Sequence, residues 1–164
     1  MDGTPKRVVV AIGSNHHASE AIVKGLKLTQ ELLTDTTASS VIETAPIGIP
    51  SPPFLNCLVV GYTLMTSDEL VGAFKRIERQ CGDRPSLRRQ HRITLDIDLL
   101  EYDGTRYHQA DWERAYIQVL LQEVYSYQQS SVDPPAANLS SSDQPFIDTM
   151  LADTSPADKP ISPK

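Results

Sequence analysis

The 164-residue sequence predicts an α+β domain, an α/β sandwich in which helices cover one face of an antiparallel sheet. Two observations carry this prediction. Segments with strand-like and helix-like patterns follow one another in the order β-α-β-β-α-β, and both helical segments have a single apolar face to bury. This order is that of the ferredoxin-like arrangement. We therefore expect the second face of the sheet to stay open for chemistry.

The first half of the chain supplies a β-α-β unit. Residues 7–12 (RVVVAI) form a β-branched run that ends at the turn signal Gly-Ser-Asn, as a central strand does. Apolar side chains recur every three or four positions over residues 18–33, which predicts an amphipathic helix. Residues 38–44 (ASSVIET) are typical of a second strand. A loop follows at residues 45–53, and its four prolines stiffen it because the proline ring fixes φ.

The next elements complete the predicted sheet. Residues 54–64 (FLNCLVVGYTL) are an apolar run typical of a third strand. Thr66 and Glu69 have the spacing of a capping box, so a second helix begins there and runs to about residue 81. The fourth strand, residues 94–102, ends at an Asp-Gly turn signal.

The C-terminal part is predicted to change character near residue 128. We expect a short pairing strand at residues 106–108 and a third helix at residues 112–127. The apolar stripe of that helix consists of Tyr116, Val119, Leu120 and Val124. Beyond it, prolines and serines replace the large apolar side chains that offset the entropy cost of ordering. We therefore divide the chain into a folded domain, residues 1–127, and a flexible tail, residues 128–164.

The overall charge limits the partners of the protein. Its net charge is -6 and its pI is near 5.1, whereas nucleic acids and anionic membranes are bound chiefly by surplus Lys and Arg. We expect small-molecule partners, no nucleic acid, no membrane, and a monomer. Cys57 and Cys81 are too few for a disulfide framework, and the N-terminal residues have neither a leader pattern nor a membrane span. These features indicate a cytoplasmic protein.

Two aspartates interrupt the fourth predicted strand. Residues i and i+2 of a strand point to the same face, so Asp96 and Asp98 lie side by side, and the apolar residues around them face the helices. The like charges would raise the pKa of one carboxyl unless a cation neutralises them. A hard divalent cation such as Mg²⁺, carried in with a nucleotide, is the usual partner. The alternative is a pair that simply faces solvent.

A basic loop directly precedes the aspartates. Five basic residues fall within nine positions, namely Arg84, Arg88, Arg89, His91 and Arg92. Arginine makes fixed, multidentate hydrogen bonds to phosphate oxygens. Beside the aspartates, the cluster favours metal-bridged phosphate chemistry, although alone it would equally suit a solvated loop.

Four motifs then occur in order along the chain: residues 11–15 (AIGSN), 44–48 with 54–56 (TAPIG and FLN), 76–78 (RIE) and 94–98 (TLDID). From about residue 6 to residue 120, this ordered set resembles the 6-hydroxymethyl-7,8-dihydropterin pyrophosphokinases, folate-pathway enzymes with a ferredoxin-like fold. The resemblance implies transfer of pyrophosphate from ATP to the hydroxymethyl group of the pterin. It also implies two Mg²⁺ ions bridged by Asp96 and Asp98.

The resemblance implies roles for further residues. The pterin ring would stack between Phe54 and Tyr116, each of which could instead be a core residue. Its polar edge would contact Asn56 and the loop near Thr44 and Pro46.

The charged candidates complete the implied site. Arg84 and Arg92 join the two aspartates as catalytic candidates. The candidates for contacts to ATP are Lys75, Glu78, Arg89, His108 and Arg114, although the alternative for Lys75 is a solvated helix face.

The sequence also departs from the family pattern in the loop before the aspartates. The family has a tryptophan where this chain has Gln90, and an arginine where it has Ile93, so Arg92 would have to reach in from one position earlier. A polar tail replaces the proline-rich and apolar segment that follows the last helix in the family. These changes bear on how a lid closes over the site.

Two other functions fit parts of the pattern. The first is a non-catalytic paralogue that binds a pterin or a nucleotide on the retained scaffold. The second is a nucleotidyl-transferring enzyme, because ferredoxin-like palms with paired aspartates occur there too. The short, acidic chain disfavours the polymeric substrate that the second function would require.

Overall fold

A computed structural model of the protein describes residues 3–46, 48 and 50–130. These residues form an antiparallel six-stranded sheet in the order β2-β4-β1-β5-β6, with β3 also paired to β4. The strands are β1 (Lys6–Ser14), β2 (Thr34–Ala38), β3 (Ile42–Thr44), β4 (Phe54–Thr63), β5 (Asp96–Tyr102) and β6 (Thr105–Arg106). The α+β class and the antiparallel sheet predicted from the sequence are confirmed.

The helices connect and flank these strands. Three of them are long: α1 (Ala18–Leu32), α2 (Ser67–Gln80) and α5 (Ala115–Ser130). Two are short: α3 (Pro85–Arg88) and α4 (Gln109–Trp112). The predicted capping box is present at the start of α2: the backbone N–H of Glu69 donates to Thr66 Oγ1 (3.2 Å), and that of Thr66 donates to Glu69 Oε1 (2.9 Å). Within the described residues no helix is long and apolar enough to cross a membrane.

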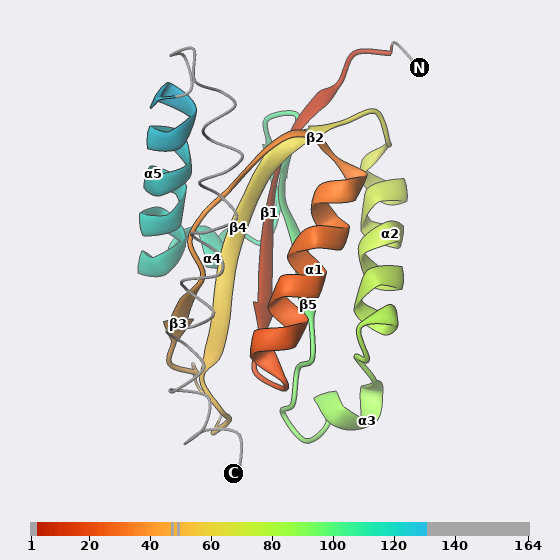
Figure 1. Cartoon of the computed structure of the whole chain (residues 1–164), viewed down its shortest axis with the longest axis vertical. Coiled ribbons are helices and arrows are strands. Elements are labelled where there is room, and N and C mark those ends of the chain that lie inside the picture. The colour runs from red at the N-terminus through yellow and green to blue at the C-terminus, as the bar shows by residue number, and fades with distance from the viewer. Residues whose placement is uncertain (1–2, 47, 49, 131–164) are drawn as a thin grey trace.

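The sheet lies between two layers of helices (Figure 1). On one face α1 and α2 pack over a core that includes Ile22 and Phe74. On the other face α4 and α5 pack over a second core that includes Trp112 and Leu120. The expectation that helices cover only one face is therefore wrong, because the third predicted helix folds back onto the opposite side.

The second face is covered over only part of its length, and this leaves the space for a site. Where α5 packs, β1 and β4 present Val9, Leu58 and Val60. Further along the same face, the strands present the small or polar residues Gly13 and Asn56, which line a pocket. Apolar residues attract the helix, and the small and polar ones beyond them stay uncovered.

Several element boundaries differ from the predictions. Only the two ends of the strand expected at residues 38–44 are strand, because β2 begins earlier and ends at Ala38, and residues 42–44 form β3. Between them the Leu58 N–H of β4 donates to the Ser39 hydroxyl (2.8 Å) instead of a backbone carbonyl. The helix expected at residues 112–127 is α4 and α5, and α5 includes residues 128–130 of the predicted tail. In α5, Leu120 and Val124 are buried as predicted, but Val119 is 61% exposed, and Ile117 and Leu121 complete the buried stripe. The rest of the predicted tail, residues 131–164, lies outside the described residues.

Candidate active site

A pair of carboxylates lies at the start of β5, on the face of the sheet that α4 and α5 cover only in part. Asp96 and Asp98 lie opposite Gly13 and Ala11 of β1, as the alternation of the strand requires. Burial, followed by the charge of Asp96 and a hydrogen bond to it, raises the pKa of Asp98 to about 7. Nε2 of His108 is 3.9 Å from Asp98 Oδ1. Without a cation, the two carboxylates would repel each other when both are ionised.

The carboxylate pair fits the requirements of magnesium. Mg²⁺ prefers oxygen ligands and is commonly held by one or two carboxylates, with water and substrate phosphates completing the shell. The described residues contain no cluster of three or more His, Cys, Asp or Glu side chains that would enclose a metal ion. Asp96 and Asp98 could therefore hold an ion that a phosphate substrate helps to bind.

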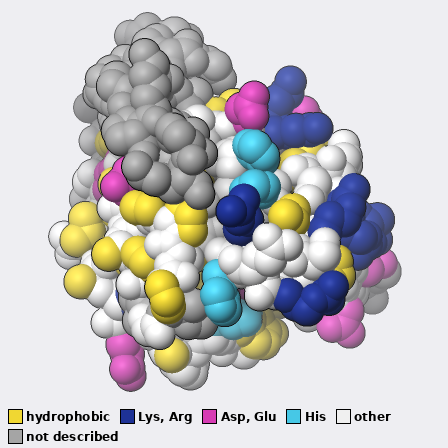
Figure 2. All heavy atoms as spheres, turned by 90° about the horizontal axis from the view of Figure 1, so that it is seen from below, with side chains coloured by type: hydrophobic (Ala, Val, Ile, Leu, Met, Phe, Trp, Pro, Cys, Tyr) yellow, Lys and Arg dark blue, Asp and Glu magenta, His cyan; other side chains and the backbone are white. Residues whose placement is uncertain are grey.

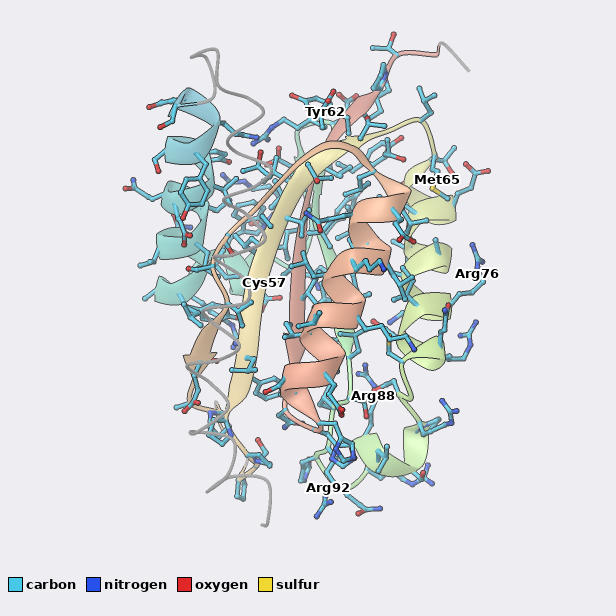
Figure 3. The ribbon with its side chains drawn as sticks, in the orientation of Figure 1. Cys57, Tyr62, Met65, Arg76, Arg88 and Arg92 are labelled. Carbon is cyan, nitrogen blue, oxygen red and sulfur yellow. The ribbon has the colours of Figure 1, made fainter. Side chains whose placement is uncertain are left out.

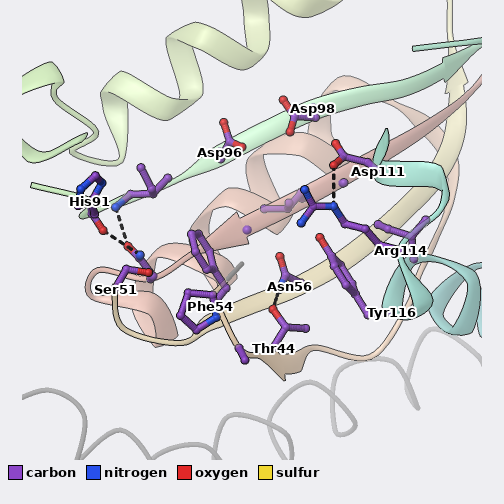
Figure 4. Close-up of a pocket in the computed structure, with 18 residues that line it drawn as sticks. Thr44, Ser51, Phe54, Asn56, His91, Asp96, Asp98, Asp111, Arg114 and Tyr116 are labelled. Carbon is purple, nitrogen blue, oxygen red and sulfur yellow. Dashed lines mark hydrogen bonds and ion pairs between the residues drawn. The ribbon is translucent and has the colours of Figure 1, made fainter. Parts of the chain in front are cut away.

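A pocket of about 320 Å³ adjoins the carboxylates (Figure 4). Phe54 and Tyr116 stand on either side of Asn56 in this pocket, which also contains Asp96 and Asp98. Burial raises the pKa of the Tyr116 hydroxyl, so this side chain stays neutral. Two aromatic walls with a polar group between them suit a flat heterocycle.

The polar floor of the pocket is fixed by pairing between strands. The Asn56 Nδ2 donates to Thr44 Oγ1 of β3 at 2.6 Å, and Asn56 is buried. Asn56 lies opposite Gly13 of β1, and a Cβ at position 13 would be only 2.8 Å from Asn56 Oδ1. The glycine therefore leaves room for the amide oxygen of Asn56.

Arg88 is the arginine that the fold brings to the carboxylates. Its Nε donates to Asp83 Oδ2 (2.7 Å), and its Nη2 donates to the Leu95 carbonyl (3.0 Å) and to Asp96 Oδ1 (3.3 Å). Burial opposes the charge of Arg88, but its hydrogen bonds and these carboxylates offset that effect and raise its pKa. The residue was seen in the sequence only as one member of a basic cluster, since the short α3 that aims it inward has no clear pattern.

Glu78 is buried at the end of α2 and binds the edge of β5. Its Oε2 accepts the backbone N–H of Ile97 (2.8 Å), and its Oε1 accepts from Lys75 (3.3 Å). Burial raises the pKa of Glu78 despite these hydrogen bonds. Neither Glu78 nor Lys75 lines the pocket. In this structure Glu78 instead joins α2 to β5, and Lys75 binds Glu78.

Three other predicted arginines, Arg84, Arg89 and Arg92, do not line the pocket. Arg84 donates to the backbone carbonyls of Arg79 (3.0 Å) and Asp83 (2.8 Å). Arg89 is exposed. Figure 3 shows Arg88 near the lower ends of α1 and α2, and Arg92 below it. Basic side chains gather on this end of the surface (Figure 2).

The remaining predicted residues lie in or beside the pocket. Thr44, Pro46, Phe54, Asn56, Arg114 and Tyr116 line it together with the two aspartates. Arg114 is paired with Asp111 at 3.1 Å. Five other residues also line the pocket, namely Asn15, Ser51, His91, Ile93 and Asp111. In the sequence, His91 was noted in the basic cluster and Ile93 in the loop before the aspartates, but none of the five was predicted as a site residue. Asn15 also had a visible signal, as part of the turn after the first strand, whereas Ser51 and Asp111 had none.

The fold and the site together define a class: a ferredoxin-like α+β domain with a carboxylate pair beside an aromatic-walled pocket. The model of the 7,8-dihydro-6-hydroxymethylpterin-pyrophosphokinase (HPPK) family matches residues 9–126, and the chain belongs to this family.

The chain is similar to several folate synthesis bifunctional proteins. It is 32% identical over 128 residues to the mitochondrial protein of Arabidopsis thaliana, a match that covers 71% of this chain and 23% of that protein. It is 32% identical over 134 residues to the mitochondrial protein of Pisum sativum (73% and 25%). It is also 32% identical over 117 residues to the protein of Chlamydia caviae (66% and 26%). The chain thus spans about a quarter of the length of these relatives.

Proposed function

We propose that this domain is an ATP-dependent diphosphokinase of folate biosynthesis. It transfers pyrophosphate from ATP to the hydroxymethyl group of 6-hydroxymethyl-7,8-dihydropterin and releases AMP. The observation that carries the proposal is that one pocket contains both the aromatic walls and the carboxylate pair. A heterocycle and a metal-bound triphosphate can therefore meet in a single cavity. Family membership supports the same conclusion.

The residues of the pocket act mainly by binding and orientation. Phe54 and Tyr116 stack on the two faces of the pterin, and Asn56 binds its polar edge through the oxygen that Gly13 leaves free. The nucleophile is the hydroxyl of the substrate, which bonds to the β-phosphorus as the bond to the AMP oxygen breaks. No covalent enzyme intermediate is needed, so positioning and charge neutralisation supply the catalysis.

The side chains that would neutralise the charge of the triphosphate lie on the side of the pocket that β5 forms. Asp96 and Asp98 would hold magnesium, and we propose two ions for the complete reaction. When bound, magnesium neutralises charge on the triphosphate and polarises its oxygens. Arg88 orients Asp96, since its Nη2 donates to Asp96 Oδ1. His108, near Asp98, is the candidate for a contact to the phosphates.

Release of AMP tests the proposal directly. AMP should form from ATP only when both the hydroxymethyl pterin and Mg²⁺ are present. Asp96→Asn should lower kcat about 100-fold or more, because it removes charge stabilisation at the reacting phosphates. Asp35→Asn is the matched control, since Asp35 is exposed on β2, and it should leave kcat unchanged. Equal activity of the two variants would contradict the assigned site.

One observation favours the second candidate, a binding protein without turnover. Ile93 lines the pocket where the family has an arginine, and Arg92 does not line it. An apolar side chain cannot stabilise the charge that develops on a transferring phosphate. The scaffold would then bind a pterin or a nucleotide and release it unchanged.

Calorimetry combined with AMP release separates the two candidates. Tight binding of the pterin by folded wild-type protein, with no AMP formed in excess ATP and Mg²⁺, would favour the binding protein. The substitution Ile93→Arg should then restore a measurable rate. AMP formation by the wild type would instead support the diphosphokinase.

A further inference from the structure

Asn15 joins two segments that are far apart in the sequence. It directly follows β1, is only 6% exposed, and lines the pocket. Its backbone N–H donates to the Ile93 carbonyl (2.9 Å), and its Nδ2 donates to the His91 carbonyl (3.0 Å). Its Oδ1 accepts the backbone N–H of Ile93 (2.6 Å). Asn15 thus makes three hydrogen bonds to the backbone of the segment that leads into the aspartates.

The segment that Asn15 holds has an unusual backbone. His91 has φ of 59°, a left-handed conformation that a residue with a Cβ adopts at a cost. The chain turns back on α3 here: the N–H of His91 donates to the Arg88 carbonyl (2.9 Å), and the N–H of Arg92 donates to the Leu87 carbonyl (2.9 Å). The turn fixes one end of the segment, and Asn15 fixes the other.

The held segment forms a wall of the pocket. Both His91 and Ile93 line the pocket, on the side where Asp96 begins β5. Among the residues that the structure describes, the segment has no strand partner of its own, since β1 pairs with β5 only from Gly13 and Asp96 onward. The hydrogen bonds of Asn15 to His91 and Ile93 therefore hold this segment beside the end of β1, beyond the last residue pair of β1 and β5.

We propose that Asn15 is a positioning residue that holds residues 91–93 as a wall of the pocket and thereby favours binding of the heterocycle. The inference rests on the proposed function for the identity of that ligand. Only an amide side chain offers one donor and one acceptor at this reach. Aspartate lacks the donor for the His91 carbonyl, and alanine lacks both groups.

Amide hydrogen exchange on the full chain, without ligand or metal, tests the contact itself. The Ile93 amide should exchange at least tenfold faster in Asn15→Ala than in the wild type. Asn15→Asp keeps the acceptor and should give an intermediate rate. Tyr102→Phe is the control, because it removes a hydrogen bond to the Met65 carbonyl (2.9 Å) elsewhere, and the Ile93 rate should not change. An unchanged Ile93 rate in Asn15→Ala would overturn the proposal.

Kinetics and binding then test the consequence for the site. The KM for the hydroxymethyl pterin, or its Kd by calorimetry, should rise about tenfold in both Asn15 variants, and the KM for ATP should change less than twofold. An equal rise in both KM values would overturn the proposal, since it would indicate general loosening. The failures are distinguishable: absence of AMP with wild-type protein contradicts the proposed function, whereas exchange and pterin binding still test the role of Asn15.

Discussion

Substitution of Gly13 by alanine tests how the pocket floor is built. Gly13 lies on β1 opposite Asn56, and an added Cβ would be 2.8 Å from Asn56 Oδ1. Real Cβ atoms essentially never approach other heavy atoms so closely, so a neighbouring group has to move. Asn56 is buried and bonded to Thr44 at 2.6 Å, and therefore cannot simply swing into solvent.

The cost follows from the two ways in which the pocket can respond. If the strands shift, the overpacking should lower the free energy of unfolding by about 1–3 kcal/mol. If Asn56 turns away, its hydrogen bond to Thr44 is lost, which costs about 0.5–1.5 kcal/mol. Both responses displace the Asn56 amide, so Gly13→Ala should also weaken pterin binding, by about tenfold.

Urea unfolding measures this effect, with Gly72→Ala as a matched control. Gly72 lies within α2, and its added Cβ would meet only Arg76 Nη1, at 3.7 Å. Alanine is favoured over glycine in a helix by about 1 kcal/mol, so the control should raise the free energy of unfolding. The same chemical change should thus have opposite signs at the two positions. A Gly13→Ala protein as stable as the wild type, with unchanged pterin affinity, would refute the proposed geometry of the floor.

Three further predictions concern charged groups. Because the pKa of Asp98 is about 7 against an ordinary 3.8, the folded state keeps a proton that the unfolded chain releases. In EDTA the free energy of unfolding should therefore fall as the pH rises from about 4 to 7, by up to about 4 kcal/mol. The slope should become clearly smaller in Asp98→Asn, where the raised pKa of Glu78 remains, and an equal slope would contradict the prediction. Arg88→Gln leaves Asp83 without its partner and should destabilise by about 1–3 kcal/mol in urea, whereas the exposed Arg76→Gln should change little. Glu123→Gln replaces one of the two oxygens that accept from the Ser40 N–H (2.8 Å) and the Ser40 hydroxyl (2.7 Å). It should therefore lower the thermal midpoint, and an unchanged midpoint would refute this prediction.

The sequence predicted the elements best where a pattern is local. The capping box at Thr66, the apolar strands and the alternation of Asp96 and Asp98 depend on residues a few positions apart, and all three are present in the structure. The split of the second strand depends on Ser39, whose hydroxyl binds a strand far along the chain. No local pattern contains that information.

The candidate site was predictable only in part, for the same reason. The resemblance pointed to the residues of the pocket that belong to motifs, among them Phe54, Asn56 and Tyr116. It also pointed to Arg84 and Arg92, whereas the arginine that contacts Asp96 is Arg88. Which arginine points inward depends on the short α3 and the left-handed turn at His91, and neither has a strong sequence signal.

The sequence by itself determined the order of strands and helices, and it placed two carboxylates on one face of a strand, because side chains alternate along a strand. Only the tertiary structure decided that α5 covers part of that face and leaves a pocket beside it. It also decided that Asn15 holds the segment before the aspartates, by contacts to His91 and Ile93, which follow Asn15 by 76 and 78 positions in the chain. Such contacts arise from packing between distant segments, which the pattern of either segment alone does not specify.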